Sequence, residues 1–236
     1  MVLAATQYPK TEVSSILDDP DWPEFFPLSR EAFQRYDEAP DTEFYSSPRF
    51  VTHIDDPAIG ALTKWYQERL PPSGTDASVL DMCSSWISHF PKQYSLQGRV
   101  AGVGMNEEEL KRNPQLTEFA VQDLNNNPKL PYPDNTFDAV VNAVSVDYLT
   151  RPLEVFQEVH RVLKPGGLAA FSFSNRCFPT KAIAVWTASG DPDHVWIVGS
   201  YFHYSVSGGF TAPACDDISP KPGRSDPMYV VYARKK

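Results

Sequence analysis

Short runs of apolar residues, each followed by polar or small residues, recur along the middle of the chain. Runs of this length predict buried β-strands. They place five strands at residues 78–82, 98–104, 116–121, 137–142 and 168–173. Two further runs, at 210–218 and 228–233, predict an irregular sixth strand and a seventh strand.

Apolar residues at helical spacing lie before and between these runs. Those from Ala58 to Leu70 predict an amphipathic helix, and Pro152 in a first turn predicts a second helix that a glycine turn at 164–167 closes. Further helices are expected at 84–90, around 107–111 and over 193–205. Strands that alternate with helices in this way indicate a doubly wound α/β fold.

The first fifty residues differ from the rest in composition. They are rich in proline, acidic and aromatic residues, and only 29–36 could form a short helix. The segment has too many aromatic residues for a disordered tail. We therefore expect an N-terminal cap segment at residues 1–56 that folds onto a domain at residues 57–236.

Ligand-type side chains stand where the predicted strands end. Asp81 ends the first strand, Met105 and Asn106 follow the second, and Asp123 follows the third. Open parallel sheets bind ligands outside the carboxyl ends of their strands. This spacing therefore predicts a nucleoside pocket along that edge.

Three motifs make the chain resemble a known family. They are the block from Val79 to His89, the stretch Leu130–Asp138 and the corner Leu163–Gly167. Their order resembles the class I S-adenosylmethionine-dependent methyltransferases, in particular the type 11 group that includes ubiquinone and menaquinone methyltransferases. The resemblance covers residues 79–173, with 228–233 as the last strand. It implies a Rossmann-like, doubly wound sheet of seven strands, mostly parallel, with an antiparallel last strand.

The resemblance also implies the cofactor S-adenosyl-L-methionine and the product S-adenosyl-L-homocysteine. Asp123 would accept a hydrogen bond from the adenine amino group, and Leu124 would offer its backbone N–H. Asp81 is likewise expected to bind the cofactor, with a role limited to orienting the loop backbone as the alternative. The remaining positions expected near the methionine moiety and the sulfonium are Cys83, Ser84, Ser85, Asn142, Ala143 and Val144.

Two departures from the family bear on the cofactor. The loop after the first strand holds no glycine, which also argues against a dinucleotide, because a pyrophosphate needs a glycine-rich loop. Gly104 stands where the family has the acid that binds the ribose, so Asn106 or a backbone group would have to replace that acid. The alternative is a non-catalytic, methyltransferase-like scaffold that binds a partner.

Candidates for chemistry lie in two places. Tyr45 and Arg49 could hold the carboxylate of the methionine moiety, and His53 could act as a base, although a residue that leads into the next helix is an alternative role for it. After the fourth strand, Asp147 and Tyr148 are expected to contact the methyl acceptor. The substrate candidates are Ser145 and Arg176, and a solvated loop is the alternative for Arg176.

Composition limits the classes of binding partner and the cellular compartment that we expect for the protein. The 236-residue chain has a net charge of −9, which argues against nucleic acid. It has no apolar run long enough to span a membrane, and its first residues lack the basic flank of a secretory signal. Three cysteines without a CxxC spacing favour a reducing compartment and no metal site. We expect a cytoplasmic or organellar (for example chloroplast) monomer or homodimer that methylates a small molecule; the sequence leaves the acceptor and the methylated atom open.

Overall fold

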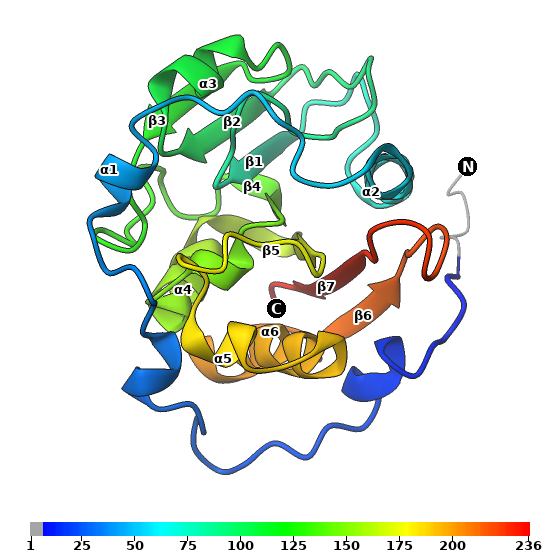
Figure 1. Cartoon of the computed structure of the whole chain (residues 1–236). Helices are drawn as coiled ribbons and strands as arrows, with labels where there is room; N and C mark the ends of the chain where they lie inside the picture. Colours follow the sequence, from blue (N-terminus) through cyan, green and yellow to red (C-terminus); the bar gives the residue numbers. More distant parts are fainter. Residues whose placement is uncertain (1–6) are drawn as a thin grey trace.

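A computed structural model describes residues 7–236, and the first six residues of the predicted cap lie outside this range. Its centre is a seven-stranded sheet in the order β3-β2-β1-β4-β5-β7-β6 (Figure 1). The strands are β1 (Ser78–Met82), β2 (Arg99–Gly104), β3 (Glu118–Val121), β4 (Phe137–Ala143), β5 (Leu163–Phe173), β6 (Ala214–Asp217) and β7 (Tyr229–Arg234). All neighbours pair in parallel except β7, which is antiparallel to β5 and β6. The predicted fold class, with its antiparallel last strand, is confirmed.

The strand order contains a topological switch between β1 and β4. From β1 the chain proceeds outward to β2 and β3 and then returns to β4 on the other side of β1. Crossovers on the two sides of such a point leave a crevice at the carboxyl ends of the strands. The fold therefore places a crevice at the edge where the sequence predicts a nucleoside pocket.

Helices cover both faces of the sheet. They are α1 (Asp41–Phe44), α2 (Asp56–Arg69), α3 (Glu107–Arg112), α4 (Pro152–Val162), α5 (Ala184–Thr187) and α6 (Asp191–Ser205). The buried side of α2 packs on one face, against apolar residues of β1, β2, β4, β5 and β7. The opposite face is covered by α4 and α6 (Figure 1). There the ring of Phe156 from α4 stacks on that of Phe171 from β5, with centroids 4.3 Å apart. No helix in residues 7–236 is long and apolar enough to cross a membrane.

The helix predicted at 84–90 is wrong. The chain from β1 to β2 is irregular, and the apolar side chain of Phe90 packs against Tyr66 of α2 instead. The backbone excludes a helix because Cys83 and His89 both have φ of +58°, in the left-handed region. The helix preceding β1 thus covers this face of the sheet.

Two smaller expectations also need correction. The predicted helix at 29–36 is only the 3-10 turn Arg30–Phe33. The glycine turn at 164–167 lies inside β5, as an irregularity at which the register with β4 shifts. Gly166 has φ of +80° there, and its N–H donates to the carbonyl of Lys235, so this part of β5 stays bonded to the end of β7.

The N-terminal segment, residues 7–55, lies along the domain (Figure 1). Near its start the Thr11 hydroxyl donates to Asp217 at 2.8 Å, and Trp22 stacks on His203 with ring centroids 4.8 Å apart. After α1 the segment crosses in front of β2 and β1 before it enters α2 (Figure 1). The division into a cap at 1–56 and a domain at 57–236 stays a prediction.

Close packing at the end of β2 requires glycine at position 104. A Cβ on Gly104 would lie 2.1 Å from the carbonyl oxygen of Ser84, whereas a Cβ on Gly60 in α2 would meet nothing within 4 Å. We expect Gly104→Ala to lower the free energy of unfolding by about 1–3 kcal/mol, because a backbone has to move. Gly60→Ala should raise it by about 0.5–1 kcal/mol, since alanine favours the helix. Chemical denaturation of both variants measures the pair, and equal shifts of the same sign would contradict the packing.

Candidate functional site

A cavity of about 290 Å³ lies at the carboxyl ends of β1 to β4, beneath the N-terminal segment. Sixteen of the residues that the sequence proposed line it: Tyr45, Arg49, His53, Asp81, Cys83, Ser84, Ser85, Met105, Asn106, Asp123, Leu124, Ala143, Val144, Ser145, Tyr148 and Arg176. They come from the ends of four strands, from the N-terminal segment and from the loop after β5. The cavity therefore joins candidates that lie more than 130 positions apart in sequence.

Two predicted residues are not part of the cavity lining. Asn142 is fully buried in β4, where its Nδ2 donates to the carbonyl of Met82 at 3.0 Å and so joins β4 to β1. Asp147 is only 2% exposed, in the short turn Val146–Tyr148, and its burial raises its pKa to about 8. The expectation that Asp147 contacts an acceptor does not agree with this position. A carboxyl so far from solvent stays protonated at neutral pH.

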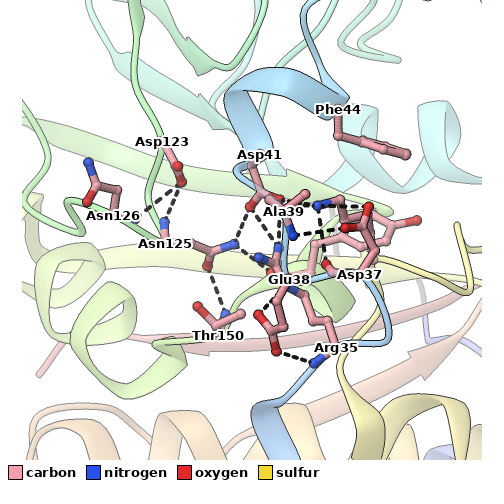
Figure 2. Close-up of polar contacts among 12 residues, drawn as sticks. Arg35, Asp37, Glu38, Ala39, Asp41, Phe44, Asp123, Asn125, Asn126 and Thr150 are labelled. Atoms are coloured by element: carbon pink, nitrogen blue, oxygen red, sulfur yellow. Dashed lines mark hydrogen bonds and ion pairs between the residues drawn. The ribbon is translucent and has the colours of Figure 1, made fainter.

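Asp123 shapes the loop that follows β3. Its Oδ1 accepts from the backbone N–H groups of Asn125 and Asn126, at 2.9 and 3.3 Å, in the turn that is typical of aspartate (Figure 2). This leaves Oδ2 for a ligand. The loop is held in turn by the side chain of Asn125, which donates to the carbonyl of Tyr148 and accepts from the N–H of Thr150.

Asp41, which the sequence did not indicate, links this loop to the N-terminal segment. Its carboxylate accepts two bonds from Nη1 of Arg35, at 2.7 and 2.8 Å, and one from Nδ2 of Asn125 at 2.9 Å (Figure 2). The Nζ of Lys181 lies 3.3 Å from Asp41 Oδ1 and donates to the carbonyl of Ala39 at 2.6 Å. The side chains of Arg35, Asp41 and Lys181 are at most 7% exposed, so this ion cluster is buried.

The end of β2 offers no free side chain. Gly104 lies under the backbone of Ser84. The side chain of Asn106 caps α3, because its Oδ1 accepts from the N–H groups of Glu108 and Glu109, and its Nδ2 donates to the carbonyl of Tyr45. Asn106 thus holds the N-terminal segment in place, and its amide cannot replace a ribose-binding acid without losing these bonds.

Arg49 brings a positive charge to the cavity. Its guanidinium lies over the ring of Phe44, 4.3 Å from the centroid, and 5.5 Å from that of Phe178. Nη2 donates to the carbonyl of Phe44, but Nη1 is buried and has no hydrogen-bond partner among the described residues. A buried donor of this kind is costly unless a ligand pairs with it, and a carboxylate matches the guanidinium best.

Backbone strain collects around the cavity. Outside glycine, five described residues have positive φ, and four of them line the cavity: His53, Cys83, His89 and Val144. Such conformations cost energy and persist where the surrounding structure enforces them, often at functional sites. Here they turn side chains of the loops toward one space.

Burial also perturbs titrating groups at the site. Asp81 accepts from the Ser84 hydroxyl at 2.6 Å, yet burial raises its pKa to about 7. Desolvation lowers the pKa of His53, and that of His89 to about 4, so both imidazoles are mainly neutral at pH 7. His89 also lines the cavity.

The loop after β5 closes the remaining side of the cavity. The hydroxyl of Tyr148 accepts from the N–H of Phe178 at 2.8 Å and so orients this loop. Arg176 is exposed and its Nε donates to Asp226 at 2.8 Å, which leaves much of its guanidinium in solvent. Arg176 therefore stands at the rim.

Comparison with known proteins places this site in context. Residues 82–171 match the family described as a methyltransferase domain. A demethylmenaquinone methyltransferase of Listeria monocytogenes is 28% identical over 168 residues, which cover 66% of this chain and 66% of the relative. A Chlamydia trachomatis protein of the same name is 27% identical over 145 residues, covering 53% of this chain and 62% of that protein. The chain thus spans just under two thirds of the length of these relatives.

Solved structures share the fold. A methyltransferase from Aquifex aeolicus aligns over 83% of this chain and 97% of its own, with a TM-score of 0.53 and 20% identity. One from Mesorhizobium loti aligns over 75% of this chain and all of its own, with a TM-score of 0.51 and 19% identity. At this identity, the likeness concerns the arrangement of the sheet and helices.

The position of Asp147 predicts a pH dependence of stability. Its carboxyl has a pKa of about 8 in the folded protein, against about 4 in an unfolded chain. Between these values the folded state binds more protons, so this group lowers the free energy of unfolding as pH rises, by up to about 1.4 kcal/mol per pH unit. Asp147→Asn should remove that contribution in urea denaturation between pH 5 and 8.

The matched control is Asp76→Asn, at an exposed aspartate. It should leave the pH dependence of the wild type unchanged. If Asp147→Asn also gave a curve parallel to the wild type, Asp147 would be ionised in the folded state and its burial would be misassigned.

Proposed function

Because the chain belongs to the class I S-adenosylmethionine-dependent methyltransferases of the type 11 group, we propose that it transfers a methyl group from S-adenosyl-L-methionine to a small-molecule acceptor and releases S-adenosyl-L-homocysteine. One observation carries the proposal. Side chains from the ends of β1, β2, β3 and β4 line a single cavity at the topological switch point. The family supports the type of reaction, and the cavity is where we propose that it takes place.

The residues of the cavity fit the adenine end of the cofactor. Asp123 keeps Oδ2 free of bonds within the described chain, so it can accept from an exocyclic amino group. The same carboxylate is rigid because Oδ1 closes the turn to Asn125, and Asn125 is tied to Asp41. An oriented acceptor needs no rearrangement when the base arrives, which favours binding.

The methionine end requires a partner for a carboxylate. Arg49 has an unpaired Nη1 at the cavity and aromatic rings on its sides that hold the guanidinium in place. We assign the carboxylate of the methionine moiety to Arg49, with Tyr45 beside it. Cys83, Ser84 and Ser85 offer small side chains and close backbone approach at the end of β1.

The bound cofactor supplies an electrophilic methyl group on a sulfonium. The chain must then align an acceptor with that methyl group and exclude water. Apolar walls are provided by Val51, Ile87, Val144 and Phe178, while Ser145 and Tyr148 supply polar contacts. His53 is mainly neutral at pH 7 because its pKa is lowered, so its imidazole can accept a proton from an acceptor that has one to lose.

A small molecule is the acceptor class that the cavity favours. Its volume of about 290 Å³ lies near the lower end of the range of about 300–1,000 Å³ that is typical of ligand pockets. The net charge of −9 disfavours a nucleic-acid acceptor. The relatives named demethylmenaquinone methyltransferase support an apolar ring compound, which would fit walls of this kind.

The proposal is tested in two steps. Isothermal titration calorimetry of the full chain with S-adenosyl-L-homocysteine should show one site per chain. Incubation with isotope-labelled S-adenosyl-L-methionine and fractions of a metabolite extract should then transfer label to a small molecule. The absence of any binding at millimolar concentration would instead favour the non-catalytic scaffold.

The assignment of Asp123 gives a sharper prediction. Asp123→Asn keeps Oδ1 for the turn to Asn125 but puts an N–H₂ group where the adenine amino group would donate. We expect the dissociation constant of S-adenosyl-L-homocysteine to rise by about 10- to 100-fold, equivalent to about 1–3 kcal/mol. Calorimetry measures the affinity, and the melting temperature should change little because the turn survives.

Asn126→Ala is the matched control in the same loop. The side chain of Asn126 is exposed, and only its backbone N–H bonds to Asp123. It should bind like the wild type. If Asp123→Asn and Asn126→Ala bound S-adenosyl-L-homocysteine with equal affinity, the assignment of Asp123 to the adenine amino group would be wrong.

A further inference from the structure

The end of β2 cannot supply the carboxylate that a ribose usually meets in doubly wound folds. In such folds an acidic residue near the second strand accepts from the ribose hydroxyls. Here the position holds Gly104, and any side chain on it would collide with the carbonyl of Ser84. A cis-diol placed at this corner of the cavity would therefore need an acceptor from another element.

Glu109 provides a carboxylate at this corner. It lies in the first turn of α3, which starts directly after β2, and lines the cavity although the residue is only 9% exposed. Its neighbours Glu107 and Glu108 are exposed to solvent, so one of three consecutive glutamates is directed inward. The cap formed by Asn106, whose Oδ1 accepts from the N–H of Glu109, fixes where this turn begins.

The carboxylate of Glu109 is oriented and only partly satisfied. Oε1 accepts from the backbone N–H of Arg49 and Oε2 accepts from the hydroxyl of Ser85, both at 2.6 Å. A carboxylate offers about four acceptor positions, so about two remain, one on each oxygen. Both of these donors are uncharged, and no Lys or Arg side chain within residues 7–236 forms an ion pair with Glu109.

The other acids that line the cavity are committed elsewhere. Asp41 is bound to Arg35 and Asn125. Asp81 accepts from the Ser84 hydroxyl and is buried at the end of β1. Asp123 follows β3, one strand further from the switch point. Glu109 lines the cavity from the first turn of α3, directly after β2, and a ribose between the ends of β1 and β3 would lie at this corner.

We propose that Glu109 accepts hydrogen bonds from the 2′- and 3′-hydroxyls of the cofactor ribose and so replaces a carboxylate at the end of β2. This inference rests on the proposed function, because it presupposes an adenosine ligand in the cavity. Two adjacent hydroxyls provide two donors for the two free acceptor positions. Because the same carboxylate holds the N–H of Arg49, ribose binding also steadies the N-terminal segment over the site.

The test compares ligands that differ in one hydroxyl. The dissociation constants of S-adenosyl-L-homocysteine and its 2′-deoxy and 3′-deoxy analogues are measured by calorimetry on the full chain. The wild type should prefer the ribose compound by about tenfold or more over each analogue, as expected for a hydrogen bond to a charged acceptor. Glu109→Gln should weaken binding of the ribose compound about tenfold while changing the analogues about threefold or less.

Two further variants separate a ribose contact from a structural role. Glu108→Gln removes a charge from the exposed neighbouring residue and should keep the full preference for the ribose compound. Glu109→Asp keeps the charge but shortens the side chain, and it should lose the preference as Glu109→Gln does. The melting temperature of each variant shows whether it is folded.

The outcomes are distinct. If Glu109→Gln weakens all three ligands equally, Glu109 acts only by holding Ser85 and Arg49, and the inference is overturned. A wild type that binds the deoxy analogues as tightly as the ribose compound overturns it as well. A wild type that binds none of the three ligands overturns the proposed function together with the inference.

Discussion

The buried charge cluster around Asp41 determines how the site is built. This carboxylate meets Arg35 from its own segment, Lys181 from the loop after β5 and Asn125 from the loop after β3. Buried ion pairs add little net stability, because desolvation offsets much of their attraction, but removing one partner from such a pair typically costs about 3–5 kcal/mol. The cluster therefore selects one position for the N-terminal segment. With that position fixed, Arg49 and its neighbours lie over the ends of β1 and β2.

The second constraint is the contact between the loop after β1 and the end of β2. The N–H of Ser84 donates to the carbonyl of Val103 at 2.7 Å, and the carbonyl of Ser84 occupies the space beside Gly104. A helix directly after β1 would carry the chain away from this point. The irregular loop instead stays over β2, with Cys83 in a left-handed conformation. The irregular loop can therefore pack on the end of β2 only because position 104 has no side chain.

The sequence predicted the strands, and the edge formed by their carboxyl ends, because a continuous apolar run forms a buried strand with little dependence on distant residues. It placed a helix at 84–90 because the spacing of apolar residues does not report the φ of His89. Asn106 was chosen for the ribose from its position after β2, whereas the structure uses its amide as a helix cap. A polar residue before three glutamates is a capping signal that could have revealed this. The contacts of Asp41 with Lys181 could not be predicted, because 140 positions separate them and no pattern joins them.

Charge in the cavity is distributed so that few groups compete for a cofactor. The guanidinium of Arg49 is held by aromatic rings and a carbonyl, and no carboxylate within residues 7–236 pairs with it, so it brings a positive charge to the cavity. Burial raises the pKa of Asp81 to about 7, so its carboxyl is only partly ionised at neutral pH. In the binding mode that we propose, the guanidinium of Arg49 would therefore orient the zwitterionic amino acid group of the cofactor. The backbone N–H of Arg49 also donates to Glu109, so the residue proposed for the methionine carboxylate is bonded directly to the residue proposed for the ribose.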